Sequence, residues 1–247
     1  MAGSLRLPLV DLASTDRTAA AGMIRQACLE YGFFYLTNHG IDSEVFWLVF
    51  GESKKFFCLS FDEKMQLNHS EYHRGYTPLY AENLDPSTKA KGDLKESFYI
   101  GPSSSTNDVN QWPSEESLPI WRSTMVSYYE KVLSVGKKLL ALIALALNLD
   151  ERFFEINGAL SSPMGFLRLL HYPGKRINGH DNGKMCHRFM GHSSLTLEIY
   201  WRGGLTAYSD IFKRLSEIML LRVEESVDKV IVSSRTTREK NLSLKKE

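Results

Sequence analysis

Two neighbouring stretches decide the fold of this chain: LPLVDL (Leu7–Leu12) and YGFFYLTNHGI (Tyr31–Ile41). Each contains an apolar run of strand length, and the second run is FFYLT (Phe33–Thr37). Between them, the STD triplet at residues 14–16 offers helix caps, and Gly32 can end a helix in a left-handed conformation. Apolar residues three or four apart predict one buried helix face: Ala20, Ile24, Ala27 and Tyr31. We therefore expect a strand, a helix and a second strand.

Helical spacing recurs farther along the chain. Val45–Phe57 has an apolar face, and Ser60 with Glu63 fits the capping box of a short helix. Ile120–Leu147 is predicted to be the longest helix, and Glu151–Ile156 adds a helical turn. The apolar face of the long helix consists of residues at three- or four-residue intervals: Met125, Tyr128, Val132, Val135, Leu139, Leu142 and Ala146.

Loop and strand signals separate these helices. Asn68–Asp93 carries Gly and Pro among polar residues, which predicts an extended surface loop. Ser97–Ile100 is a predicted strand, and Phe166–Tyr172, closed by Pro173, is predicted to be a strand buried on both faces.

The pattern changes after Gly174. Lys175–Lys184 has neither a helical nor a strand period. An amphipathic helix is predicted over Phe212–Ile231, and Ser233–Glu247 is charged and free of aromatic residues, which predicts disorder.

Composition excludes several classes of partner. The 30 Lys and Arg residues nearly balance the 29 Asp and Glu residues, so charge gives no reason to expect nucleic acid or an anionic membrane. Cys28, Cys58 and Cys186 lack the close spacing of zinc sites, and we expect reduced thiols. The longest apolar run, Leu139–Leu147, is too short to span a bilayer, and the amino terminus lacks a secretory pattern. We expect a cytoplasmic protein.

Several short sequence motifs of this chain occur together in one enzyme family. After LPLVDL and YGFFYLTNHGI come KKFF (Lys54–Phe57), DEK (Asp62–Lys64), RGYTPL (Arg74–Leu79), DLKESF (Asp93–Phe98) and LRLLHYP (Leu167–Pro173). In this order they resemble the amino-terminal half of the plant-type, isopenicillin N synthase-like iron(II)/2-oxoglutarate-dependent dioxygenases. The resemblance implies an α+β fold, the amino-terminal part of a double-stranded β-helix (jelly roll) with long packing helices and an incomplete barrel.

The strand at the end of this region carries the main candidate site. Arg168 and Tyr172 are four residues apart, so on a strand they share a face that could receive a carboxylate. The resemblance implies that Tyr172 lines the 2-oxoglutarate pocket with Arg168 nearby, and that Tyr76 of RGYTPL is on the substrate side of the pocket mouth. The alternative stays open: a buried tyrosine with a satisfied hydroxyl and an arginine in an ion pair.

Other histidines are weaker candidates. His39 beside a turn could be a metal ligand, but such a residue is more often a satisfied hydrogen-bonding group. His69 and His73 would share a helix face, yet Gly75 and polar neighbours favour a loop.

The ligands that hold iron in the family are missing. The resemblance implies an H-x-D motif soon after the HYP strand, then a distant His followed by Arg-x-Ser, with Fe(II) and 2-oxoglutarate as cofactors. Here His180 is followed directly by Asp181, and adjacent strand residues face opposite ways. The Arg-x-Ser at 214–216 follows no such His closely. We therefore predict no catalytic or metal-binding residue; a site built from His180, Asp181, His187 and His192 is the alternative.

The genetic code suggests a cause. If the codons of Asn182–Ala207 are regrouped from the last base of each codon, synonymous choices exist that yield WEDVPQIHGAFIINIGDILERWTNC. This string resembles the carboxy-terminal segment of the family. We therefore expect two parts: residues 1–174, the dioxygenase amino-terminal region with the first core strand, and residues 175–247, an atypical tail that is out of frame and partly disordered.

Two functions follow from the resemblance. One is an oxidoreductase that couples 2-oxoglutarate decarboxylation to hydroxylation or desaturation of a small organic substrate. The other is a truncated, inactive isoform whose exposed sheet edge at Phe166–Tyr172 lowers its stability. Neither function involves nucleic acid or a membrane.

Overall fold

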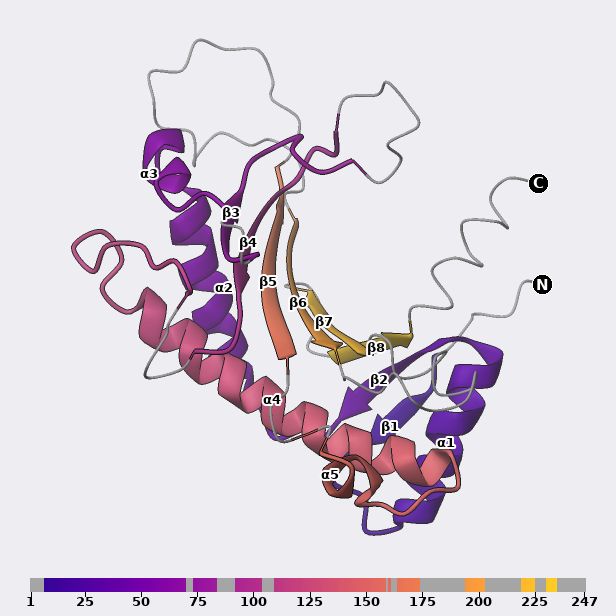
Figure 1. The fold of residues 1–247 in the computed structure, drawn as a ribbon. Coiled ribbons are helices and arrows are strands. Elements are labelled where there is room, and N and C mark those ends of the chain that lie inside the picture. The colour runs from indigo at the N-terminus through magenta and orange to yellow at the C-terminus, as the bar shows by residue number, and fades with distance from the viewer. Residues whose placement is uncertain are drawn as a thin grey trace, which may run out of the picture.

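One sheet with helices on one side organises the described part of the chain (Figure 1). The computed structural model describes residues 7–69, 73–83, 92–103, 109–158, 160, 164–173, 194–202, 219–224 and 230–234. Its described strands form an eight-stranded sheet in the order β1-β2-β8-β7-β6-β5-β4-β3. The predicted α+β class is confirmed, and over the described residues the sheet is open, with β1 and β3 at its edges.

The predicted strand, helix and strand at the start are confirmed. They are β1 (Leu9–Asp11), α1 (Arg17–Glu30) and β2 (Phe33–Thr37), and β1 pairs with β2 in parallel. The Asp16 side chain accepts a hydrogen bond from the Ala19 amide at 2.9 Å and caps α1. Gly32 follows the helix with φ of 73°, a left-handed conformation that glycine adopts readily.

The predicted helices that follow are also present. They are α2 (Ser43–Phe57), α3 (Phe61–Met65), α4 (Trp121–Ala146) and α5 (Phe153–Ile156). The capping box of α3 forms as expected between Ser60 and Glu63. Among these described helices, none combines the length and apolarity that a membrane span requires.

Helices α2 and α4 pack against the half of the sheet formed by β3 (Gly75–Thr77), β4 (Glu96–Ile100) and β5 (Met164–Tyr172). Phe98 of β4 is the meeting point, because its ring centroid lies 4.7 Å from that of Phe56 in α2 and 5.1 Å from that of Trp121 in α4. All three side chains are fully buried. This cluster fixes β4 and β5 against the helices.

Strand β3 corrects the prediction of a surface loop over Asn68–Asp93. Gly75–Thr77 is a strand antiparallel to β4, and Tyr76 is buried opposite Phe98. Gly75 has φ of 104°, and a Cβ there would lie 2.4 Å from the Leu67 carbonyl oxygen. Glycine and proline in this segment were typical of a loop, but burial of Tyr76 and pairing with β4 outweigh that local signal.

The tail contributes three strands, β6 (Ser194–Arg202), β7 (Met219–Glu224) and β8 (Val230–Ser234). The predicted helix over Phe212–Ile231 is therefore wrong where the structure describes it, because short apolar runs fit either element and here sheet pairing decides. The exposed edge expected at β5 is also wrong, since β6 pairs antiparallel along the whole of β5. The predicted disorder of Ser233–Glu247 is wrong at Ser233 and Ser234, which lie in β8. Predictions for residues 174–193, 203–218, 225–229 and 235–247 lie outside the described residues.

One cysteine, Cys58, is not the reduced thiol that the sequence predicted. Cys58 lies in a disulfide, whereas Cys28 is a free thiol whose pKa is raised by burial. Sequence spacing could not reveal this, because a disulfide depends on proximity in the fold. Cys186 lies outside the described residues.

Candidate functional site

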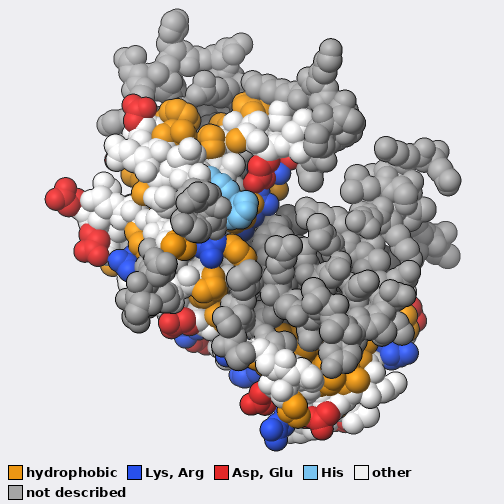
Figure 2. Space-filling view, in the orientation of Figure 1, with side chains coloured by type: hydrophobic (Ala, Val, Ile, Leu, Met, Phe, Trp, Pro, Cys, Tyr) orange, Lys and Arg blue, Asp and Glu red, His pale blue; other side chains and the backbone are white. Residues whose placement is uncertain are grey.

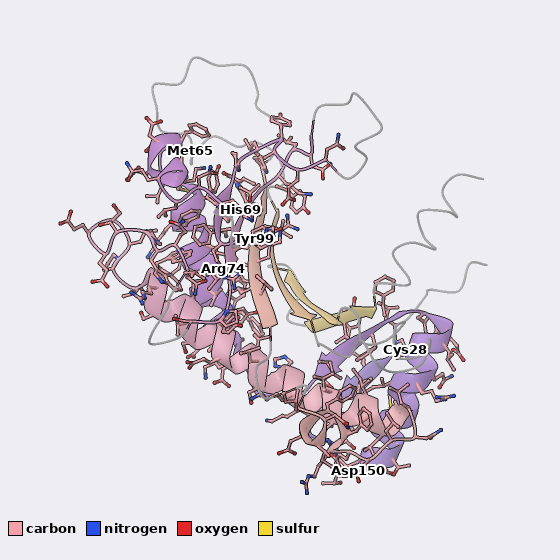
Figure 3. All side chains as sticks on the ribbon, in the orientation of Figure 1. Cys28, Met65, His69, Arg74, Tyr99 and Asp150 are labelled. Atoms are coloured by element: carbon pink, nitrogen blue, oxygen red, sulfur yellow. The ribbon has the colours of Figure 1, made fainter. Side chains whose placement is uncertain are left out.

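Alternate residues of β4 and β5 divide into two faces. One face, the Phe98 face, carries Phe98, Leu167 and Leu169 and packs toward α2 and α4. The other, the Tyr99 face, carries Tyr99, which Figure 3 labels, and its cross-strand partner Arg168. Tyr172 lies four residues after Arg168 on β5 and therefore on the same face. The prediction that Arg168 and Tyr172 share a face agrees with this register.

Arg168 is buried and already engaged. Its guanidinium forms an ion pair with Glu82 and lies over the Tyr99 ring, 4.8 Å from the centroid. Lys95 also contacts Glu82, at 3.1 Å, and Asp93, at 2.6 Å. Burial alone would raise the pKa of the Glu82 carboxyl, but Arg168 and Lys95 lower it below its ordinary value. This is the ion pair that the alternative interpretation expects for Arg168, and its co-substrate role stays a prediction.

Tyr172 and Tyr76 lie in contrasting places. Tyr172 is at the exposed end of β5, with 36% of its surface accessible. Tyr76 lies in β3, and its hydroxyl donates a hydrogen bond to Glu96 Oε2 at 2.5 Å. Burial, with that contact to Glu96, raises the pKa of Tyr76 far above its ordinary value. The buried, engaged hydroxyl gives no support for the predicted contact of Tyr76 with substrate.

A buried polar cluster on the Phe98 face was missed by sequence reasoning. We call it the Glu96 network: Lys64, Tyr76, Glu96 and His171. Lys64 Nζ donates to Glu96 Oε2 at 2.8 Å, and Nδ1 of His171 lies 2.7 Å from Glu96 Oε1. Burial would raise the pKa of Glu96, but the contacts with His171, Lys64 and Tyr76 lower it. Glu96 is therefore a buried carboxylate that joins α3, β3, β4 and β5.

The Glu96 network is also held by α2. Lys64 Nζ donates to the Phe57 carbonyl oxygen at 3.1 Å, and the Phe57 ring stacks on His171 with centroids 5.1 Å apart. Lys64 and Glu96 contact each other and other protein atoms, and both side chains are at most 5% exposed. Its chemistry is that of a structural ion pair. The two charged partners, Lys64 and Glu96, belong to the sequence motifs DEK and DLKESF.

The histidines considered as metal ligands in the sequence lie in two separate places. His39 accepts a hydrogen bond from the Ile41 amide at 3.1 Å and packs on Phe46, as the alternative for that residue expected. His69 and His73 bring their rings to 5.3 Å from each other, and His69 lies 5.7 Å from the Tyr99 ring. They are not on a helix.

The part of the chain that the structure describes does not fit an iron centre. Within it, no group of three His, Cys, Asp or Glu side chains is close enough to hold a metal ion. A ferrous site of the 2-oxoglutarate oxygenase type needs two His and one carboxylate on one side of the ion. His180, Asp181, His187 and His192 lie outside the described residues.

Comparison with known proteins identifies the scaffold. Residues 7–115 match a family model described as the amino-terminal region of the non-haem dioxygenase in morphine synthesis. Azadirone synthase LFS of Melia azedarach is 36% identical over 182 residues, which are 69% of this chain and 54% of that protein. The 2-oxoglutarate-Fe(II) type oxidoreductase hxnY of Emericella nidulans is 32% identical over 190 residues, 68% of this chain and 53% of that protein. The chain thus spans about half the length of these curated relatives.

A solved crystal structure is also similar to this chain. The crystal structure of a full-length Neurospora crassa protein in complex with α-ketoglutarate superimposes with a TM-score of 0.60 at 27% identity, over 70% of this chain and 56% of that one. Through its amino-terminal part, this chain belongs to the iron(II)/2-oxoglutarate-dependent oxygenase family.

Proposed function

We propose that this chain is built on the scaffold of an oxidoreductase that couples decarboxylation of 2-oxoglutarate to hydroxylation or desaturation of a small organic molecule, and that the chain itself does not turn over. The relatives support the reaction class, because they include 2-oxoglutarate-Fe(II) type oxidoreductases. The sequence supports the loss of turnover, because no H-x-D follows the HYP motif at His171–Pro173. The missing H-x-D is the observation that carries the proposal.

The co-substrate assignment is the finer part of this proposal. Tyr172 is exposed at the end of β5, and Arg168 lies on the same face. A carboxylate of 2-oxoglutarate would have to share Arg168 with Glu82, which already pairs with it. The proposal also includes a small-molecule substrate, because a second crystal structure of the same full-length Neurospora crassa protein is a complex with α-ketoglutarate and thymine. A cytoplasmic location is a further part of the proposal.

Succinate formation tests the proposal. The purified chain would be incubated with 2-oxoglutarate, ferrous iron and ascorbate, and succinate would be measured against a boiled sample. We expect no succinate above the boiled control. Turnover above that control would show that the chain completes the family's iron site and would overturn the proposal.

The unusual tail is a separate part of the proposal. We propose that residues 175–247 are read out of the family's frame, because the regrouped codons of Asn182–Ala207 yield a string that resembles the family's carboxy-terminal segment. The genomic sequence that follows the codon for Gly174 tests this directly. The expected result is a block that encodes an H-x-D in frame with Gly174, followed by the codons of Asn182–Ala207 read one frame away from the family's frame. A genomic sequence without such a block and without the frame change would contradict it.

A further inference from the structure

One carboxylate on the Tyr99 face, that of Glu82, is contacted by three donors. We call the three donor side chains the Glu82 cradle: Arg168, Lys95 and Tyr99. The Arg168 guanidinium pairs with Oε2 of Glu82, and Lys95 Nζ lies 3.1 Å from the same oxygen. The Tyr99 hydroxyl donates to Oε1 of Glu82 at 3.2 Å. Charge-assisted hydrogen bonds of this kind also hold carboxylate ligands.

The cradle is positioned by the sheet. Arg168 of β5 and Tyr99 of β4 are cross-strand partners, and the guanidinium lies 4.8 Å from the centroid of the tyrosine ring (Figure 3). Lys95 immediately precedes β4. The positions of these three residues therefore follow from the pairing of β4 with β5.

Glu82 comes from a different segment, Pro78–Asn83, which follows β3; we call it the strap. Two backbone hydrogen bonds fix the strap: the Asp93 amide donates to the Glu82 carbonyl oxygen at 2.8 Å, and the Tyr80 amide donates to the Asp93 carbonyl oxygen at 3.0 Å. The strap thus delivers a carboxylate to donors that belong to the sheet and its flank.

Electrostatics at the cradle favour the ionised carboxylate. Burial would raise the pKa of Glu82, but Arg168 and Lys95 lower it below its ordinary value. Burial would lower the pKa of Lys95, but Asp93 and Glu82 raise it above its ordinary value. Glu82 and Lys95 are therefore both charged at neutral pH.

The position of the Glu82 carboxylate can be reached from solvent. The Glu82 side chain is 31% accessible, whereas those of Arg168 and Lys95 are 11% and 10% accessible. Figure 2 shows acidic and basic side chains beside histidine side chains at the surface of the described residues. If the carboxylate is removed, the space that it occupied remains within reach of the two cations and the tyrosine hydroxyl, and it can admit a small anion.

We propose that the Glu82 cradle is a carboxylate-binding site whose ligand in this chain is its own Glu82 side chain. Carboxylates from solution, 2-oxoglutarate included, are excluded from Arg168 while Glu82 occupies that position. The contact is autoinhibitory toward carboxylate ligands on the Tyr99 face. Only the exclusion of 2-oxoglutarate rests on the proposed function; the cradle itself rests on the contacts of Glu82.

Replacement of the missing atoms by acetate tests the cradle. Glu82→Ala keeps Cβ and removes the Cγ methylene and the carboxylate, which are the atoms that acetate supplies. Thermal unfolding would be followed in sodium acetate and in sodium chloride of equal ionic strength. Relative to chloride, acetate at about ten times its Kd is expected to raise the unfolding temperature of Glu82→Ala by about 3 to 5 °C, and that of the wild type by less than about 1 °C.

Three controls separate this effect from a general effect of salt. Acetamide, which has the shape of acetate without its charge, is expected to give no stabilisation. Glu155→Ala removes a glutamate that also faces an arginine, Arg152, but at an exposed site, so acetate and chloride should act alike on it. Adding Lys95→Gln to Glu82→Ala removes one donor and is expected to weaken acetate binding about tenfold.

Refolding gives the same test if Glu82→Ala is unfolded in chloride. Transfer to acetate is then expected to restore the circular dichroism of the wild type, and transfer to acetamide is not. Absence of refolding, equal stabilisation of Glu82→Ala and Glu155→Ala by acetate, or equal effects of acetate and acetamide would overturn the proposal.

A last comparison tests the exclusion of 2-oxoglutarate. In the absence of metal, 2-oxoglutarate is expected to stabilise Glu82→Ala and to leave the wild type unchanged; equal stabilisation of both would overturn the autoinhibitory contact. These results are independent of turnover. Succinate formation by the wild type would overturn the proposed lack of turnover and leave the acetate result untouched.

Discussion

The Phe98 face and the Tyr99 face are built from alternate residues of the same two strands, yet their polar groups are held differently. On the Phe98 face, Glu96 is 4% exposed and is contacted by Lys64, Tyr76 and His171 within 2.8 Å. On the Tyr99 face, Arg168 is buried and Tyr172 is exposed. We infer that the polar groups of the Phe98 face contribute more to the stability of the fold than the hydroxyl at the exposed end of the Tyr99 face.

Removing the charge of Glu96 is expected to have the largest effect. Glu96→Gln leaves the Lys64 ammonium buried without its carboxylate, and breaking a buried ion pair in this way costs about 3 to 5 kcal/mol of unfolding free energy. Urea unfolding at neutral pH measures the loss. Glu155→Gln is the matched control: its pair with Arg152 is 3.5 Å apart and both side chains are more than 60% exposed, so a change below about 0.5 kcal/mol is expected.

The same variant makes a prediction about pH. The pKa of Glu96 in the folded chain lies below its ordinary value of 4.5, so its stabilisation is present above that pH and is lost as the pH falls through the folded pKa. The difference in unfolding free energy between the wild type and Glu96→Gln should therefore shrink on acidification below about pH 4.5. A difference that grows in acid would contradict the assignment of Glu96 as a stabilising carboxylate.

Gly75 tests whether β3 depends on its unusual backbone. In Gly75→Ala, the new Cβ would meet the Leu67 carbonyl oxygen at 2.4 Å in a left-handed conformation. We expect a loss of about 2 to 3 kcal/mol in unfolding free energy. Gly51→Ala is the control, because a Cβ there meets nothing within 4 Å inside α2, and it should stabilise the chain by about 0.5 to 1 kcal/mol. Similar values for the two variants would contradict the role of Gly75.

A pair of hydroxyl deletions compares the faces with the same chemistry. Tyr76→Phe removes the donor to Glu96, and hydrogen bonds to a charged group contribute about 1.5 kcal/mol or more. Tyr172→Phe removes a hydroxyl from the exposed end of β5 and should change the unfolding free energy by less than about 0.5 kcal/mol. Thermal unfolding of both variants checks the pair, and a larger loss in Tyr172→Phe would reverse the comparison.

Local signals in the sequence were sufficient for much of the fold. The cap at Asp16, the capping box at Ser60 and the long apolar period of α4 predicted helices that are present. The alternation of side chains along a strand also predicted that Arg168 and Tyr172 share one face of β5. These features depend on residues close together in the chain, so a single sequence contains them.

The misses share a different cause. Strand β3 has three residues and forms because Tyr76 packs opposite Phe98. β7 and β8 have apolar positions that also fit a helix, and only pairing within the sheet decides between the two. The Glu96 network brings together residues from separate elements, because Lys64 of α3 and His171 of β5 both contact Glu96 of β4. Such contacts follow from tertiary packing, which local patterns do not encode.

The unfolding free energies of Glu96→Gln and Tyr172→Phe, measured under the same conditions, test the division between the two faces most directly. We expect Glu96→Gln to lose about 3 kcal/mol or more, because it leaves the buried Lys64 ammonium without its carboxylate. We expect Tyr172→Phe to lose less than about 0.5 kcal/mol, because its hydroxyl lies at the exposed end of β5. If Tyr172→Phe were as destabilised as Glu96→Gln, the division between the faces would be wrong.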